Sequence, residues 1–414
     1  MDKSSSRIEK YVTKKGLCTG CGICSALFKD KIDIEMKESG FYRPFFLESL
    51  SKSELQTLEQ ICPALNMKGS VDSDLDSPLM GKHIDSKVGW SMSEKIRYLG
   101  SSGGALSAFL LYLLEKEKID GVIHVGRGTT PLTAEGKLST TPEEVLANTG
   151  SAYMPVALLK NLKSMLDKVD KVALVGKGCD IRAAKRFIEL NPEYKSKVLV
   201  FIGILCGGSP SINGTYQILN DFGIKKEEIK SFRYRGNGWP GSCTAITNNN
   251  TEHKMSYNDA WAKKLGPTSP LVCKLCFDGI AESADIVFGD AWKCEKNNYP
   301  SFEETDGRNL IICRTEDGKK LLDEAVSSSY IELSDEFIGD SEFNIIQPSQ
   351  SNRRYLAKYK LFGLKMIGFS YPTVDFKQLS WMSELSGIQL SLLTKLRTML
   401  GSVKRARRAS KAES

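Results

Sequence analysis

The chain has 414 residues, of which 41% are hydrophobic and 26% are charged, and its formal net charge is +7. This length allows two or three domains, and the composition is that of a globular protein. No apolar run reaches the roughly 18 residues of a membrane-spanning helix, and the opening segment MDKSSSRIEK lacks the apolar core of a signal peptide, so we expect a cytoplasmic protein. In that reducing compartment, closely spaced cysteines indicate metal or catalytic sites rather than disulfides.

Three cysteines near the start of the chain are separated from one another by two residues, and a fourth lies further on, directly before Pro63. This spacing is typical of a [4Fe–4S] cluster, which takes three ligands from one tight loop and a remote fourth that precedes proline. Gly20 and Gly22 lie between the thiols and let the backbone wrap closely, because glycine tolerates positive φ. Zinc and unligated thiols are the alternatives, although structural zinc usually takes two CxxC-type pairs or includes histidine. The candidate ligands are Cys18, Cys21, Cys24 and Cys62.

A polar linker, roughly residues 68–86, separates these cysteines from a more apolar stretch. In that stretch a Ser-Ser-Gly-Gly turn at residues 101–104 precedes apolar residues at helical spacing. Ser101 or Ser102 can cap the expected helix. Bare backbone N–H groups at such a turn, with the positive end of the helix dipole, suit a phosphate. A capped helix without a ligand is an equal alternative.

Beyond this turn, short apolar strands alternate with helical stretches, which predicts an α/β fold. Functional sites in such sheets collect at the carboxyl ends of the strands. Cys179 and Cys206 fall just past two expected strand ends, where ligands would converge. Strands are expected at residues 121–125, 171–176, 198–205, 286–289 and 310–313, and a helix at residues 180–190.

A second group of four cysteines is available in this region. Cys273 and Cys276 form a CxxC pair, to which Cys179 and Cys206 can be added. The spacing alone leaves alternatives open, because a CxxC pair is also typical of a redox disulfide or of half a zinc site. The remaining cysteines are rivals for this site or buried apolar side chains. They are Cys243, Cys294 and Cys313.

Six stretches together resemble one family, the coenzyme F-420 (deazaflavin) hydrogenase/dehydrogenase beta subunits, which also includes 7-hydroxymethyl chlorophyll a reductase. They occur in order over most of residues 16–330, and the first cysteine motif is similar to that of the longer members. The stretches are SSGGALSAFLLYLLEKEKIDGVI, NTGSAYMPV, KVALVGKGCDIRAAKR, GILCGGSPS, VCKLCFDGIAESADIVFGDAW and GRNLIICRTEDGKKLL.

The resemblance implies that the α/β domain binds FAD and that the second group of four cysteines holds a [4Fe–4S] cluster beside it. It also implies that the Ser-Ser-Gly-Gly turn faces the flavin phosphate and that NTGSAYMPV lies near the flavin ring. Asp290 is expected to orient a flavin or substrate group, or else to cap a following turn. The flavin-binding candidates are Ser101, Ser102, Gly103, Gly104, Thr149, Ser151, Tyr153 and Asp290.

Two stretches qualify the resemblance. Lys177-Gly178 replaces the usual Thr-Pro or Ile-Pro turn before the first cysteine of the second group. The stretch RYRGNGWPG resembles bacterial members that accompany polysaccharide gene clusters, which implies a surface-polysaccharide precursor as substrate. Four of its residues are expected to line the substrate mouth, or else to form a Gly/Pro turn with a solvated arginine. They are Arg233, Arg235, Asn237 and Trp239.

Together these features predict a flavin-dependent iron–sulfur oxidoreductase. A ferredoxin-like donor would reduce the first cluster, the second cluster would pass single electrons to FAD, and FAD would reduce a substrate. The alternatives are a non-catalytic electron-transfer subunit that serves a partner enzyme and, more weakly, a zinc-stabilised scaffold. The expected domains are a ferredoxin-like iron–sulfur domain at residues 1–67, a flavin- and iron–sulfur-binding α/β domain at residues 87–330, and a C-terminal helical extension with a basic tail at residues 331–414.

The end of the chain carries the net charge. Seven basic residues and no acidic residue lie between positions 395 and 411, so the rest of the chain is balanced and gives no sign of nucleic-acid binding. Apolar residues at helical spacing predict an amphipathic helix over residues 381–400, with Gly387 as an interruption. Such a helix suits the anionic inner face of a membrane, but a helix packed on the body with a disordered basic end is the favoured alternative. The apolar face comprises Leu385, Ile388, Leu392, Leu393, Leu396 and Leu400.

Overall fold

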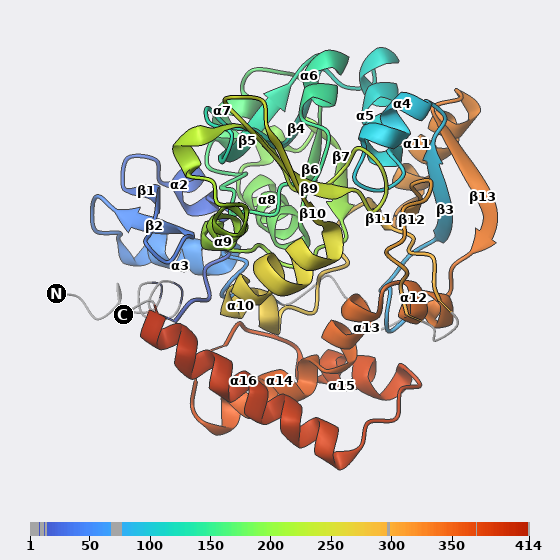
Figure 1. Ribbon diagram of the computed structural model, residues 1–414. Helices are drawn as coiled ribbons and strands as arrows, with labels where there is room; N and C mark the ends of the chain where they lie inside the picture. Colours follow the sequence, from blue (N-terminus) through green and yellow to red (C-terminus); the bar gives the residue numbers. More distant parts are fainter. Residues whose placement is uncertain are drawn as a thin grey trace.

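The computed structural model describes residues 8, 12, 15–67, 77–295, 299–369 and 371–412. An eight-stranded mixed sheet, with the strand order β13-β3-β12-β11-β7-β6-β4-β5, runs through the molecule between layers of helices (Figure 1). The alternation of strands and helices in the sequence therefore correctly predicted a mixed α/β fold.

The central strands of this sheet run parallel to one another, in the order β11-β7-β6-β4. β6 and β7 pair up to Gly176 and Gly203, so their carboxyl ends lie side by side. This register brings together the two segments that follow these strands. The four strands are β4 (Gly121–Arg127), β6 (Val172–Gly176), β7 (Val198–Ile204) and β11 (Ile286–Asp290).

The outer strands pair antiparallel with their neighbours and lengthen the sheet on both sides. One of them, β13, comes from residues that the sequence assigned to the helical extension, and the domain boundaries remain a prediction. These strands are β3 (Asp85–Ser91), β5 (Ala134–Ser139), β12 (Asn309–Cys313) and β13 (Ile331–Phe337). Two smaller antiparallel sheets contain β1 (Ile32–Met36) with β2 (Tyr42–Phe46), and β8 (Ile229–Arg233) with β9 (Ser242–Thr247) and β10 (Glu252–Ser256).

Hydrophobic cores form on both faces of the large sheet because successive side chains of a strand point to opposite sides. Leu174 of β6 belongs to the core that includes Phe187 of α8 (Gly178–Leu190). Its neighbour Ala173 belongs to the other core, with α5 (Ala105–Glu115) and α11 (Glu316–Ser327). A continuous apolar run, as in β6, is what a strand buried on both faces requires.

The N-terminal segment packs against the side of this framework (Figure 1). Its α2 (Ile23–Leu27) and α3 (Lys52–Ile61) share a core with α8. Its hairpin turn bonds to the start of α9 (Ile212–Phe222), where the Ile212 amide donates to the Gly40 carbonyl at 3.1 Å. Whether this segment is a ferredoxin-like domain of its own remains a prediction.

The last three of the C-terminal helices share a core with α10 (Leu271–Leu275), which carries Cys273. The sequence predicted one helix over residues 381–400 and a disordered end, and both predictions are wrong. The chain turns at Gly387, whose φ is 68°, and a separate helix continues to Ala412. These helices are α12 (Asp340–Ile346), α13 (Pro348–Tyr355), α14 (Ala357–Met366), α15 (Phe376–Leu385) and α16 (Leu392–Ala412).

Shorter helices connect the strands, and none of the helices described is long and apolar enough to cross a membrane. The remaining α-helices are α4 (Glu94–Leu99), α6 (Pro142–Ala147) and α7 (Leu162–Leu166). Single turns or π-type segments are η2 (Pro192–Tyr194), η3 (Lys226–Glu228), η4 (Asp259–Leu265) and η5 (Gly266–Thr268).

Candidate functional site

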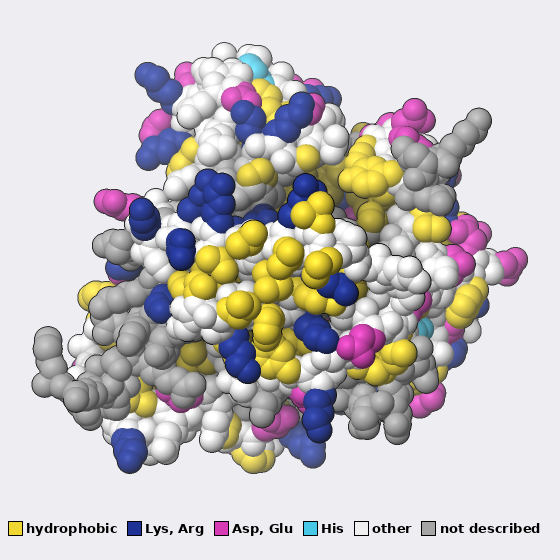
Figure 2. All heavy atoms as spheres, turned by 90° about the horizontal axis from the view of Figure 1, so that it is seen from below, with side chains coloured by type: hydrophobic (Ala, Val, Ile, Leu, Met, Phe, Trp, Pro, Cys, Tyr) yellow, Lys and Arg dark blue, Asp and Glu magenta, His cyan; other side chains and the backbone are white. Residues whose placement is uncertain are grey.

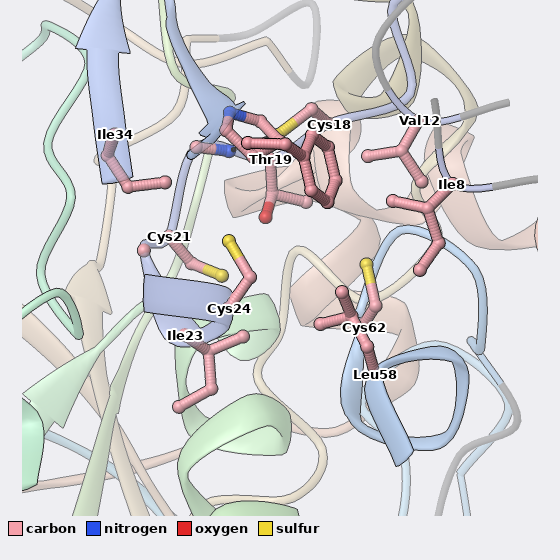
Figure 3. A pocket seen from close by; sticks show the side chains of 14 residues that line it. Ile8, Val12, Cys18, Thr19, Cys21, Ile23, Cys24, Ile34, Leu58 and Cys62 are labelled. Atoms are coloured by element: carbon pink, nitrogen blue, oxygen red, sulfur yellow. Dashed lines mark hydrogen bonds between the residues drawn. The ribbon is translucent and has the colours of Figure 1, made fainter. Parts of the chain in front are cut away.

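The first four cysteines line one cavity (Figure 3). Cys18 and Cys21 come from the loop that leads into α2, Cys24 lies in the first turn of α2, and Cys62 directly follows α3. Figure 3 shows the sulfur atoms of Cys21, Cys24 and Cys62 directed into the space between these elements. No charged side chain lies among the described residues of its wall, which also includes Ile8, Val12, Ile23, Ile34, Pro44, Phe46 and Leu58.

Local backbone conformation explains this loop. Gly20 and Gly22 adopt positive φ values of 72° and 86°, as the sequence predicted. Gly22 also lies so close to the segment around Lys160 that an added Cβ would be 2.8 Å from the backbone nitrogen of Lys160. The Gly20 amide donates to the Cys18 sulfur at 3.4 Å, and such a hydrogen bond stabilises the thiolate form of the cysteine.

The thiols of the first cavity are in a dry environment. Burial raises the pKa of Cys21 and of Cys62 to about 12, and it raises the pKa of Cys24 well above its ordinary value. Neighbouring cysteines raise the Cys24 pKa further, because several thiolates close together repel one another. The thiols of Cys21, Cys24 and Cys62 are therefore protonated at neutral pH when nothing is bound, and a metal must displace those protons.

The second four cysteines line another cavity at the carboxyl ends of β6 and β7. Cys179 lies in the first turn of α8, and Cys206 follows β7. Cys273 lies in α10 and Cys276 directly follows that helix. The Cys206 amide donates to the Gly279 carbonyl at 2.7 Å, which connects the two halves of the cavity. The expected convergence of these side chains thus occurs, and their role as cluster ligands remains a proposal.

Charged side chains surround the second cavity. Lys177 lines it and pairs with Asp180 at 2.7 Å, which gives the Lys-Gly turn a structural role. Arg182 forms a buried ion pair with Asp278. Arg353 of α13 donates to the Cys273 carbonyl at 3.2 Å and also to the Gly207 carbonyl. The sequence analysis did not single out Arg182 or Arg353, and no spacing pattern connects Arg353 with the cysteines.

These charges affect the thiols of the second cavity. Burial raises the pKa of Cys276 to about 12, and Asp278 raises it further, whereas Arg182 and Arg353 lower it. Burial also raises the pKa of Cys179 and of Cys206, and Lys177 opposes both shifts. The cations therefore favour the thiolate forms that a metal requires.

The two cavities are neighbours. Thr19 lines both of them, and the adjacent residues Cys62 and Pro63 line the first and the second respectively. All eight cysteines are free thiols. In the parts of the chain that the structure describes, no three His, Cys, Asp or Glu side chains converge tightly enough for a single metal ion. Four thiols around a cavity instead suit a cluster in which each thiolate binds a different iron.

The expected flavin-binding turn lies against Asp290 and Asn309. The Ser102 hydroxyl donates to Asp290 Oδ1 at 2.8 Å. The amides of Gly103 and Ala105 both donate to Asn309 Oδ1, at 2.8 and 3.0 Å. The sequence predicted bare N–H groups at this turn, and for these two amides that prediction is wrong. The N-cap of α5 is Gly104, with φ 70° and no side-chain bond, so the prediction of a serine cap is wrong.

One orphaned group at this turn fits a ligand. The Ser101 hydroxyl oxygen is buried and makes no hydrogen bond with the protein. A buried hydroxyl without a partner is costly unless a bound molecule supplies the bond. Thr149 contacts the helix after this turn further along, with its hydroxyl 3.4 Å from that of Ser107 in α5. Ser101 is therefore the flavin-binding candidate that the structure itself favours.

The stretch expected to line a substrate mouth forms a buried cluster instead. Arg235 is 1% exposed and binds both carboxylate oxygens of Asp290, at 2.7 and 2.8 Å. Trp239, which is 2% exposed, donates to the same carboxylate at 2.7 Å. The Arg235 guanidinium lies over the rings of Tyr257 and Trp292, and these cation–π contacts further stabilise its buried positive charge. The predictions of an open mouth and of a solvated arginine are both wrong for Arg235.

The other candidates border this cluster. The Tyr153 ring is tilted against that of Trp261, with 4.9 Å between the ring centroids. Burial raises the pKa of Tyr257, and Tyr153 raises it further. Ser151 is partly exposed two residues before Tyr153. Arg233 donates to the Arg235 and Leu99 carbonyls rather than facing solvent. The described candidates thus lie around one polar and aromatic cluster beside the start of α5.

Comparison with known proteins identifies the family. The model for the coenzyme F420 hydrogenase/dehydrogenase beta subunit N-terminus matches residues 87–163, and the model for the C-terminus matches residues 169–336. The chain is 28% identical over 238 residues to a coenzyme F420 hydrogenase subunit beta from Methanococcus voltae, covering 56% of this chain and 76% of the relative. It is 26% identical over 289 residues to an F420-dependent formate dehydrogenase subunit beta from Methanocaldococcus jannaschii, covering 67% and 68%.

A solved structure shares the fold. One chain of the F420-reducing [NiFe] hydrogenase complex from Methanosarcina barkeri superposes with a TM-score of 0.53 at 22% identity, and the match covers 70% of this chain and 97% of that one. Its name, like those of the curated relatives, describes oxidoreductases. The two family models together span more than half of the sequence, and the chain belongs to the coenzyme F420 hydrogenase/dehydrogenase beta-subunit family.

Proposed function

We propose that this chain is an electron-transfer oxidoreductase that holds two [4Fe–4S] clusters and one FAD. The observation that carries the proposal is the pair of neighbouring cavities, each with four free cysteines, which share Thr19 in their walls. When bound, such clusters exchange single electrons, whereas a flavin exchanges one or two. The domain boundaries expected from the sequence, at residues 67, 87 and 330, are part of this proposal.

The residues of the two cavities favour one order of electron flow. Lys177, Arg182 and Arg353 line the second cavity together with a single carboxylate, Asp278, so its described wall carries more positive than negative charge. The described wall of the first cavity is apolar apart from its thiols and Thr19. Because positive neighbours raise a reduction potential, an electron is more stable in the second cavity. The first cavity is then the entry point for a ferredoxin-like donor.

The flavin is proposed to lie beside the start of α5. The orphaned Ser101 hydroxyl supplies one hydrogen bond, and Thr149, Ser151 and Tyr153 border the same cluster. Helix α13 connects this region with the second cavity, because Gln347 donates to the Asp290 carbonyl at 2.7 Å and the next turn's Gln350 donates to the Cys206 carbonyl at 3.1 Å. The flavin candidates and the second cavity are thereby held in a fixed relation.

Electrons from this chain can leave by two routes. In the first, the chain is itself the reductase and acts on a small molecule, for which the stretch RYRGNGWPG suggests a surface-polysaccharide precursor. In the second, the chain serves a partner enzyme, because the solved relative is one chain of a hydrogenase complex. Co-purification of an enzyme partner from the native cell would favour the second route, and substrate turnover by the isolated chain would favour the first. Altered surface polysaccharide in a deletion strain would support the polysaccharide assignment.

Anaerobic purification followed by iron, sulfide and flavin assays tests the central proposal. We expect about eight irons and one flavin per chain, with the broad visible absorption of iron–sulfur proteins. About four irons would mean that one cysteine group has another role. A colourless protein that contains zinc would contradict the oxidoreductase function. Chromatography of the released flavin distinguishes FAD from FMN.

A further inference from the structure

The last helix presents leucines to solvent. Leu392, Leu393, Leu396 and Leu400 of α16 are between 44% and 72% exposed. The sequence had favoured packing of this apolar face on the body of the protein, and the structure contradicts that prediction. A cluster of large exposed apolar side chains on one surface marks an interaction site. Further exposed apolar residues lie in or directly after α14 and α15, namely Phe362, Met366, Ile367 and Leu385.

Small residues explain why the leucines point outward. Helix α16 contacts α14 through Ser402, which is fully buried and donates to the Lys360 carbonyl at 2.8 Å, and through the buried Ala406. An added Cβ on Gly363 of α14 would be 2.8 Å from the Met399 carbonyl oxygen. At roughly 100° per residue, Ser402 lies on the opposite side of the helix from Leu400. Attachment to the body therefore uses the small side and leaves the leucine side free of protein contacts that would bury it.

Basic residues continue the same outward side toward the end of α16. Lys404, Arg407 and Lys411 lie within roughly 40° of Leu400 around the helix axis. The segments 357–369 and 386–412 contain no Asp or Glu. Figure 2 shows the resulting surface from below, with apolar side chains gathered together and Lys and Arg side chains around them. We call the exposed leucines and these basic residues of α16 the basal face.

We propose that the basal face binds the surface of an anionic lipid bilayer, with the leucines in the interface and the basic residues against lipid headgroups. Exposed leucines beside lysines and arginines are the features of a helix that lies in a membrane surface. A second copy of this chain fits less well, because it would bring another uniformly basic face against this one. The inference is independent of the redox function, since α16 contributes none of the described residues that line either cavity.

Sedimentation of the intact protein with lipid vesicles tests the proposal. We expect binding to vesicles of phosphatidylcholine mixed with phosphatidylglycerol, and much weaker binding to phosphatidylcholine alone. Leu396→Ser combined with Leu400→Ser should weaken binding by roughly tenfold or more per leucine. Lys404→Gln combined with Arg407→Gln should weaken it by roughly fivefold per residue at low salt. Both variants should keep the iron and flavin content of the wild type.

A matched control replaces exposed apolar residues elsewhere. Leu47→Ser combined with Phe337→Ser alters side chains that are 55% and 65% exposed but lie outside the basal face. Vesicle binding by this variant should equal that of the wild type. The proposal is wrong if the wild type does not sediment with anionic vesicles, or if the leucine variant sediments equally well. It is also wrong if light scattering shows a dimer that the leucine substitutions dissociate, because a second copy then covers the face.

Discussion

The two cysteine cavities differ in how they are built and in what surrounds them. The first takes all four cysteines from a segment of fewer than fifty residues, and its described wall is apolar. The second takes two cysteines from the segments that follow two strands and two from α10 and the residue after it, and charged side chains line it. The first cavity therefore takes its thiols from one stretch of chain, which packs against Lys160, whereas the second forms where two strands of the sheet end side by side.

The two cavities also differ in which groups oppose the rise in the pKa of their thiols. In the first cavity, burial and neighbouring thiols both raise the pKa of Cys24, and the backbone amide of Ser25 opposes the rise. In the second, Lys177 and Arg353 oppose the rise in the pKa of Cys206. We therefore expect substitutions around the first cavity to act through backbone shape and those around the second to act through charge.

Removal of one cysteine from each cavity should have the largest effect. Cys18→Ala and Cys273→Ala should each lose about four of about eight irons, because a cubane with a missing ligand is not retained. Iron and sulfide assays on anaerobic preparations measure the loss, and the two variants should show different residual electron paramagnetic resonance signals. Cys243→Ala is the control, since that buried thiol lines neither cavity. Equal iron content in all three variants would contradict both assignments.

Breaking the ion pair of the second cavity should have the next largest effect. Asp278→Asn leaves the Arg182 charge buried, with side chains that are 1% and 5% exposed, and should lower the free energy of unfolding by about 3–5 kcal/mol. The control is Asp33→Asn near the first cavity, where the pair with Lys160 is exposed and should contribute less than about 1 kcal/mol. Denaturant unfolding of both variants measures the difference. A similar loss in the two would show that burial of the pair is unimportant.

A backbone substitution should act on the first cavity alone. Gly22→Ala adds a side chain at positive φ and forces a contact with Lys160, so we expect a loss of stability of about 1–3 kcal/mol and loss of iron from the first site only. Gly223→Ala is matched in φ, at 70°, but its added Cβ would meet nothing within 4 Å. The contact with Lys160 is decisive if Gly22→Ala costs clearly more than Gly223→Ala in thermal unfolding and iron retention. If the two substitutions lower stability and iron content equally, the loss comes from the positive φ alone and the contact with Lys160 is unimportant.

Removal of a charge from the second cavity should have the smallest effect on structure. Arg353→Met should lower the reduction potential of the second site, because a positive neighbour favours the reduced form. The first site should keep its potential, since Arg353 does not line that cavity. Redox titration monitored by electron paramagnetic resonance measures both potentials. If only the potential assigned to the first site shifts, the two measured potentials have been assigned to the wrong cavities.

Much of this molecule could be predicted from short patterns in the sequence. The C-x2-C-x2-C spacing and the glycines within it identified the first cavity, because the neighbours of each thiol lie close by in the chain. Apolar runs located β4, β6, β7, β11 and β12 to within one or two residues, since a strand buried on both faces requires such a run. Strand ends and the CxxC pair already grouped the four cysteines of the second cavity, and the structure does bring them to one cavity, whereas their role as ligands of one cluster came only from resemblance to a family.

The remaining features depend on contacts between distant segments. Asn309 accepts a hydrogen bond from an amide expected to bind phosphate, and Arg235 donates to the carboxylate of Asp290. Neither contact is visible in the local sequence, because both side chains are polar and could equally face solvent. The amphipathic pattern of the last helix was visible in the sequence, but the direction of its leucines was not. That direction follows from the close packing of Ser402 and Ala406 on α14, which gives the small side of α16 to the protein and the leucine side to the surroundings. Local pattern thus determined which elements form, and packing between them determined which faces are exposed.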